Sequence, residues 1–187
     1  PAQDVKQFMR WQRWDAVNAK AYDAFRLLSR RRGWESWLRG MLAGVPAGAT
    51  VLEMGAGTGY ITVILARLGY RVLGFDLSED MLARAKGALE REGLAGGVRL
   101  WQGDAEHVDL PDASVDAVVS RWVLWTLPDP KAALAEAARL LKPGGAAVFI
   151  DGRVLEQGRL ARWRGQWMDY LLTGRKPGWR EACYANF

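Results

Sequence analysis

Short apolar runs alternate with longer stretches of helical periodicity through the middle of this 187-residue chain. Five of the runs have the length of a strand, and they cover residues 50–52, 71–75, 98–102, 115–120 and 146–150. Most of the segments between them are apolar or repeat apolar residues at three- and four-residue steps, which is typical of helices that pack on a sheet. This alternation predicts an α/β fold with a doubly wound, mostly parallel sheet and right-handed crossovers. Ligands of such sheets bind beyond the carboxyl ends of the strands.

Capping residues mark the ends of two predicted helices. Ser78 precedes Glu79 and Asp80, so it is expected to cap a helix that ends near Gly93. Asp129 stands before Pro130, which predicts a cap followed by proline at the first helical position. The Lys-Pro-Gly-Gly sequence at 142–145 is expected to close that helix before the last strand.

The two ends of the chain differ from the middle in charge and aromatic content. Residues 1–40 carry nine Lys or Arg against four Asp or Glu, and residues 153–187 carry seven against three, whereas residues 41–152 carry ten against fourteen. Seven of the ten tryptophans also lie in the two ends. Residues 4–43 have helical periodicity, interrupted at 30–33 before a second helix at 34–42. We therefore expect one domain, with a helical cap, a ligand-binding core and a C-terminal substrate-side segment at 1–45, 46–152 and 153–187.

Composition excludes several classes of site. One cysteine and one histidine, His107, make a cysteine-rich or histidine-based metal centre improbable, so no metal is expected. No run approaches the roughly 20 apolar residues of a membrane span, and residues 1–10 lack the apolar core of a signal peptide. A cytoplasmic protein is expected. His107 follows Asp104 closely, which leaves open a general base or a plain loop histidine.

The first predicted strand runs into a glycine-rich turn with a carboxylate ahead of it. Gly55, Gly57 and Gly59 form G-x-G-x-G, whereas the dinucleotide fingerprint is G-x-G-x-x-G. Glu53, two residues before the first glycine, would repel a pyrophosphate but accept a hydrogen bond from an ammonium group. Asp76 ends the second strand, where it is placed to accept hydrogen bonds from both hydroxyls of a ribose. A ribose joined to an amino acid points to S-adenosylmethionine.

Together with this turn, four further segments in order resemble the class I S-adenosylmethionine-dependent methyltransferases. The chain is most similar to the small-molecule group that includes the ubiquinone and menaquinone biosynthesis enzymes, over roughly residues 48–152. The segments are Asp76-Leu77-Ser78, Gly103-Asp104-Ala105, the fourth strand from Asp116 to Ser120, and Leu141-Lys142-Pro143-Gly144-Gly145. The resemblance implies a Rossmann-like fold and methyl transfer from S-adenosyl-L-methionine, with S-adenosyl-L-homocysteine as the product.

The resemblance also implies roles for individual residues. The turn from Gly55 through Ala56 and Gly57 to Gly59 would pass the methionine part of the cofactor, with Glu53 toward the amino group and Asp76 on the ribose. The adenine would meet the residues Leu77, Met81, Asp104 and Ala105. Met81 and Asp104 could instead be a core residue and a turn residue.

Three aromatic residues and one arginine complete the predicted site. Tyr22 resembles a tyrosine that many relatives carry on an N-terminal helix over the cofactor. Arg121, Trp122 and Trp125 follow the fourth strand, where many relatives have a small residue or a histidine. Arg121 is expected at the cofactor or at an anionic or planar acceptor, and the tryptophans at the substrate, unless either one is simply core.

The family sheet usually ends in an antiparallel hairpin, which the sequence after residue 152 does not display. Either these strands are missing because the chain is an incomplete version of a longer protein, or the edge is built differently, and the pattern favours the first. The acceptor atom, a general base and the oligomeric state stay open.

Two other functions compete with small-molecule methyl transfer. The basic, aromatic ends would suit an RNA or DNA methyltransferase, although no Asn/Asp-Pro-Pro-aromatic sequence and no cysteine near a strand end support one, so nucleic acid is not expected as partner. The chain could also bind the cofactor without catalysis, since a fold does not decide function. An NAD-dependent oxidoreductase is a third alternative.

Overall fold

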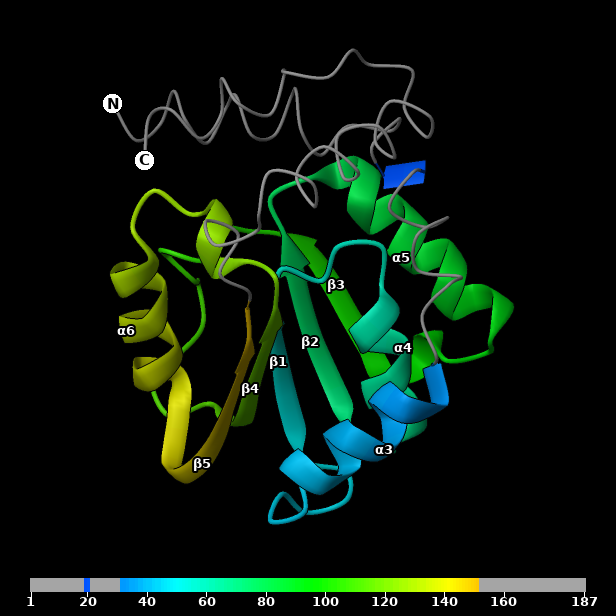
Figure 1. Cartoon of the computed structure of the whole chain (residues 1–187), viewed down its shortest axis with the longest axis horizontal. Coiled ribbons are helices and arrows are strands. Elements are labelled where there is room, and N and C mark those ends of the chain that lie inside the picture. The colour runs from blue at the N-terminus through cyan, green and yellow to red at the C-terminus, as the bar shows by residue number, and fades with distance from the viewer. Residues whose placement is uncertain (1–18, 21–30, 152–187) are drawn as a thin grey trace, which may run out of the picture.

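The computed structural model describes residues 19–20 and 31–151 (Figure 1). A helix leads into a five-stranded sheet of order β3-β2-β1-β4-β5, in which all neighbouring strands are parallel. In chain order the elements are α3 (Arg31–Met41), β1 (Thr50–Met54), α4 (Tyr60–Arg67), β2 (Arg71–Asp76), α5 (Glu79–Arg91), η2 (Ala95–Gly97), β3 (Val98–Gln102), β4 (Val115–Arg121), η3 (Leu124–Thr126), α6 (Pro130–Leu140) and β5 (Leu141–Ile150). The predicted doubly wound α/β fold is confirmed.

The sheet separates two apolar cores. On one face, Leu38 of α3 and Ile64 of α4 pack with Val51 of the central strand. On the other face, Leu52 of the same strand packs with Ala137 of α6. Figure 1 shows α6 on the opposite side of the sheet from α3 and α4. Consecutive residues of β1 are therefore buried on both faces, which explains why its sequence is apolar without alternation.

Both predicted helix caps are present. The Ser78 hydroxyl accepts a hydrogen bond from the Met81 amide at 3.3 Å and begins α5. The Asp129 carboxylate accepts from the amides of Lys131 and Ala132 and begins α6, with Pro130 at the first position. These side chains satisfy amides that the first helical turn leaves without a partner.

Strand β5 begins five residues earlier than the apolar run predicts. Leu141 already pairs with Val115, and the register between β4 and β5 shifts before Ala117 pairs with Ala146. The Lys-Pro-Gly-Gly segment therefore bulges within the strand instead of preceding it. Helix α3 likewise contains residues 31–33, which the sequence predicted as an interruption.

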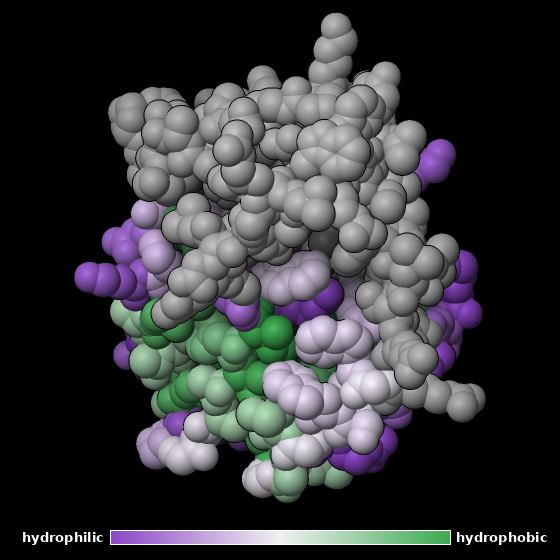
Figure 2. Space-filling view, in the orientation of Figure 1, coloured by the Kyte–Doolittle hydropathy of each residue, from purple (hydrophilic) through white to green (hydrophobic). Residues whose placement is uncertain are grey.

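Apolar side chains gather on the face over β4 and β5 (Figure 2). Ala146 and Ile150 of β5 are only partly buried, and they pack against the core that α3 and α4 cover. No helix among the described residues is long and apolar enough to cross a membrane. The first part of the predicted cap, the segment after residue 151 and the question of a terminal hairpin lie outside the described residues.

The close contact of α4 with α5 explains the last glycine of the turn. Gly59 has φ +83°, and a Cβ there would lie 2.9 Å from the Ala85 Cα. Gly69 has nearly the same φ, +86°, but open space around the Cβ position.

We predict that Gly59→Ala lowers the free energy of unfolding by about 3 kcal/mol, from backbone strain plus a clash that only a backbone shift relieves. Gly69→Ala is the matched control and should cost only about 1 kcal/mol, from the strain alone. Urea unfolding followed by circular dichroism measures both. Equal losses in the two variants would contradict the close contact.

Candidate functional site

The glycine turn between β1 and α4 is anchored on the end of β2. The amides of Gly55 and Ala56 both donate to the Phe75 carbonyl, at 2.9 and 2.8 Å. Gly55 and Gly57 have φ of +76° and +55°, in the region that favours glycine. A Cβ on Gly55 would clash with the Val123 side chain. The turn is thus held between the end of β2 and the segment that follows β4.

Asp76 reaches across this turn from the end of β2. Its Oδ2 accepts from the Gly57 amide at 2.8 Å, and its Oδ1 accepts from the Ser78 amide at 2.9 Å. Burial raises the pKa of this carboxyl, and the backbone amides of Ser78 and Gly57 oppose that shift. Each carboxylate oxygen can accept more than one hydrogen bond, so the geometry leaves capacity for a ligand hydroxyl.

Glu53 lies below the turn as a buried carboxyl, with only 3% of its surface exposed. Burial raises its pKa to about 8, and the charge of Asp76 adds to the rise. The Thr62 hydroxyl donates to Oε2 at 2.5 Å and, with the nearby charge of Arg121, opposes the shift. Sequence reasoning missed Thr62, although a lone polar residue in the apolar run 61–65 was a usable signal.

The predicted adenine residues gather beside Asp76. Met81 is buried, and its Cε lies 3.9 Å from the position of a Cβ on Gly57. The Gly103 amide donates to the Asp76 carbonyl at 3.1 Å, which brings the Asp104 and Ala105 segment to the end of β2. The Asp104 Oδ1 accepts from the Glu106 amide, and Ala105 is buried.

The loop after Asp104 is held by an arginine of α6. The Arg139 guanidinium donates to the carbonyls of Val108 and Leu110, each at 2.8 Å. Glu136 accepts from the Val108 amide at 2.8 Å and from Arg139, whose hydrogen bond is the main reason why the pKa of Glu136 falls to about 2. His107 is exposed on this loop. The loop is therefore fixed by hydrogen bonds at its start and its middle.

Arg121 ends β4 among aromatic rings. Its guanidinium carbon lies 4.2 Å from the ring centroid of Trp122, 4.9 Å from that of Trp34 and 5.4 Å from that of Tyr60. The Trp122 backbone has φ +58°, and its amide donates to the Ile150 carbonyl at 2.7 Å. Trp34 and Tyr60 come from α3 and α4, and nothing in the sequence around them signals this contact.

The remaining predicted residues are placed as follows. Leu77 is half-buried between β2 and α5, and its carbonyl accepts from Gln102. Trp125 lies in η3, and its amide donates to the Asp151 carboxylate at 3.2 Å. Tyr22 lies outside the described residues, so its role stays a prediction.

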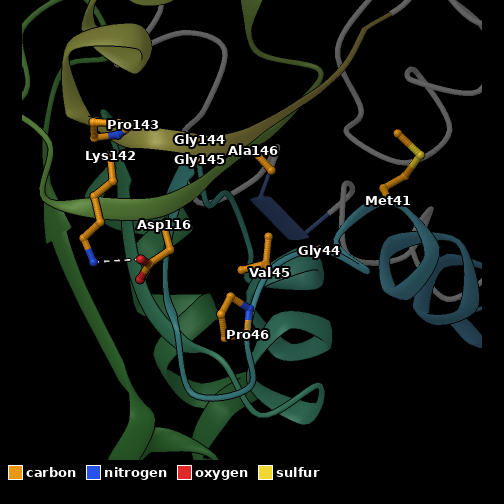
Figure 3. A pocket seen from close by; sticks show the side chains of 10 residues that line it. All are labelled: Met41, Gly44, Val45, Pro46, Asp116, Lys142, Pro143, Gly144, Gly145 and Ala146. Atoms are coloured by element: carbon orange, nitrogen blue, oxygen red, sulfur yellow. Dashed lines mark hydrogen bonds and ion pairs between the residues drawn. The ribbon is translucent and has the colours of Figure 1, made fainter.

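A separate hollow lies at the amino ends of the strands (Figure 3). Its charged groups are Lys142 and Asp116, which form an ion pair at 2.7 Å, and Asp116 also accepts from the Thr50 amide at 2.8 Å. Because Lys142 donates to it, the pKa of Asp116 is lowered. The charges compensate each other at the end of the sheet opposite to the glycine turn. No group of three or more His, Cys, Asp and Glu that could hold a metal ion occurs in the part of the chain that the structure describes.

This core matches a known protein family. The family model described as a methyltransferase domain matches residues 52–149. These residues run from the middle of β1 through nearly all of β5, and therefore include the glycine turn, Asp76 and Asp104.

Two curated relatives and one solved structure extend the comparison. The demethylmenaquinone methyltransferase of Tropheryma whipplei (strain Twist) is 38% identical over 136 residues, which are 71% of this chain and 55% of the relative. The phosphatidylethanolamine N-methyltransferase of Cereibacter sphaeroides is 37% identical over 114 residues, 61% of this chain and 56% of the relative. The chain thus spans about half the length of the curated relatives it matches. A Methanococcus maripaludis structure, proposed to be an S-adenosyl-L-methionine-dependent methyltransferase, has a TM-score of 0.71 at 22% identity, and the match covers 91% of this chain and 76% of that chain.

The raised pKa of Glu53 predicts a stability that depends on pH. Between about pH 5 and pH 8 the folded state keeps a proton that the unfolded state has lost, so the free energy of unfolding falls as pH rises, by at most about 1.4 kcal/mol per pH unit. Glu53→Gln removes this group, so the variant gains stability relative to the parent as pH rises. Urea unfolding across this range measures the difference.

Glu136→Gln is the matched control, because the pKa of Glu136 is lowered and its contribution changes only in acid. It should be less stable than the parent by a constant amount across the same range. A Glu53→Gln variant whose difference from the parent also stays constant would contradict the buried, protonated carboxyl.

Proposed function

The chain belongs to the class I S-adenosylmethionine-dependent methyltransferases, and we propose that it transfers the methyl group of this cofactor to a small-molecule acceptor. The observation that carries the proposal is the pair of carboxyl groups on the two sides of the glycine turn. Glu53 is buried at the end of β1, and Asp76 accepts from the Gly57 amide at the end of β2. The pair suits a ligand with a cationic amino-acid end and a ribose.

Each end of the cofactor has a partner of fitting chemistry. We assign the cofactor's ammonium to Glu53 and the ribose hydroxyls to Asp76, whose amide contacts already fix the carboxylate plane. The backbone of Gly55 to Gly59 faces the methionine part, since glycines leave the turn without side chains. Arg121 borders the same end of the site.

The adenine is assigned to the residues beside Asp76. Leu77 and Met81 supply apolar contact to the ring, Asp104 accepts from its amino group, and the Ala105 amide donates to a ring nitrogen. The buried position of Met81 near Gly57 and the link from Gly103 to Asp76 support this assignment.

The chemistry needs alignment more than it needs a protein nucleophile. When bound, the sulfonium supplies an activated methyl group, which an electron pair of the acceptor takes by in-line displacement, with S-adenosyl-L-homocysteine as the leaving group. The chain's residues have to orient the acceptor and exclude water. Trp122 and Trp125 are the candidate acceptor residues, because they follow β4 at the carboxyl edge of the sheet.

The relatives differ in the acceptors that their names give. One name specifies demethylmenaquinone and the other phosphatidylethanolamine, both small molecules with large apolar parts. We propose an acceptor of this general class. An RNA methyltransferase and a cofactor-binding module without catalysis are the alternatives.

Calorimetric titration with S-adenosylhomocysteine tests cofactor binding. We predict binding by the parent protein and a loss of at least about 30-fold in affinity in Asp76→Ala, because the ribose loses a charged acceptor. Asp116→Ala is the matched control, since Asp116 also accepts from a backbone amide at a strand end but lies at the opposite end of the sheet. Its affinity should stay within about threefold of the parent. NADH binding without S-adenosylhomocysteine binding would refute the proposal.

Turnover separates the proposal from its alternatives. Incubation with methyl-labelled cofactor and either quinol and amine acceptors or total RNA shows which class accepts the label. Label in the small molecules supports the proposal, and label only in RNA supports the first alternative. Cofactor binding with no transfer to any acceptor supports the non-catalytic module.

The pKa of Glu53 predicts proton release on cofactor binding. At pH 7 a carboxyl of pKa about 8 is protonated in about nine of ten molecules, and an ammonium ligand favours the ionised form. Binding of S-adenosylhomocysteine should therefore release close to one proton, and the affinity should rise with pH up to about pH 8. Calorimetry in two buffers of different ionisation enthalpy measures the release. Glu53→Gln should abolish the proton release, and an unchanged release in that variant would show that another group loses the proton.

A further inference from the structure

The sequence leaves the ligand of the Arg121 guanidinium open between the cofactor and an acceptor. It lies against Trp122, Trp34 and Tyr60, which belong to three different segments. Guanidinium groups stack on aromatic faces and direct their N–H groups outward in their own plane. The rings therefore fix the position of this charge at the end of β4.

Arg121 and Glu53 lie on the same face of the sheet. Glu53 pairs with Val119 across the parallel β1–β4 ladder, and side chains two apart on a strand share a face. Arg121 is two residues after Val119, so it lies one step beyond Glu53 toward the carboxyl edge. Its charge also lowers the pKa of Glu53, so the two groups interact electrostatically.

Both groups border the glycine turn. Glu53 stands two residues before Gly55, and Tyr60, which contacts Arg121, follows Gly59 directly. A fixed cation and a fixed carboxyl on one face are complementary to the ammonium and carboxylate of an α-amino acid.

We propose that Arg121 binds the α-carboxylate of the cofactor's methionine part while Glu53 binds its ammonium group. This inference rests on the proposed function. It assigns to Arg121 the discrimination between cofactors with and without the carboxylate.

The competing reading gives Arg121 a structural task only. In that reading its contact with Trp34 holds α3 against the sheet, and its removal weakens every ligand to the same extent. The two readings differ in whether the effect of Arg121 depends on the carboxylate of the ligand.

Calorimetry with three ligands distinguishes the two readings of Arg121. The ligands are S-adenosylhomocysteine, its decarboxylated analogue, which keeps the ammonium group, and 5′-methylthioadenosine, which lacks the whole amino acid. The parent protein should bind the decarboxylated analogue at least about tenfold more weakly than S-adenosylhomocysteine, because a charge-assisted hydrogen bond is lost. Arg121→Gln should lose at least about tenfold for S-adenosylhomocysteine and less than about threefold for the other two ligands. Arg121→Lys should restore part of the loss.

Arg99→Gln is the matched control, because the Arg99 guanidinium also lies over a tryptophan, at 5.5 Å from the Trp101 centroid, but on β3. It should leave all three affinities within about threefold of the parent. Equal losses for all three ligands in Arg121→Gln, or no loss for any of them, would overturn the assignment.

The parent protein alone decides the matter if Arg121→Gln does not fold. A parent that binds S-adenosylhomocysteine and its decarboxylated analogue equally well overturns the role of Arg121 and leaves the proposed function standing. A parent that binds none of the three ligands refutes the proposed function itself.

Discussion

The burial of the Glu53 carboxyl in the central strand constrains the whole carboxyl edge of the sheet. Strand β1 is paired on both sides and covered on both faces, so any polar side chain near its end must find partners inside the protein. Thr62 supplies a hydrogen bond, and Arg121 supplies an opposite charge. The first turn of α4 and the end of β4 thus each supply a partner for the Glu53 side chain of β1.

The sequence predicts those parts of the structure that neighbouring residues determine, and it misses those that depend on contacts between distant segments. Strand β3 has the predicted bounds, and Ser78 and Asp129 cap the helices as predicted, because each of these features depends on neighbouring residues. The start of β5 was wrong, since pairing with Val115 across a bulge draws Leu141 into the ladder and no local pattern records that contact.

The residues of the candidate site also fall into those that a local sequence pattern predicts and those that only the folded chain brings together. The glycine turn and Asp76 could be predicted because the turn demands positive φ and the strand end is marked by an apolar run. The aromatic surroundings of Arg121 could not be predicted, because Trp34, Tyr60 and Trp122 come from three segments that only the folded chain brings together. The predicted ligand contacts of all these residues stay predictions, and the family to which the chain belongs is confirmed by the match over residues 52–149.

The hydrogen bonds that Arg139 of α6 makes to the loop after Asp104 have a consequence for the entropy of ligand binding. Arg139 and Glu136 hold the backbone from Val108 to Leu110, and Asp76 holds the amides of Gly57 and Ser78, in each case by hydrogen bonds within the chain. The conformational entropy of these segments is therefore lost when the chain folds and not when a ligand arrives. The nucleoside contacts that we propose at this edge would therefore require little further ordering of these loops, and the corresponding entropic cost of binding would be small.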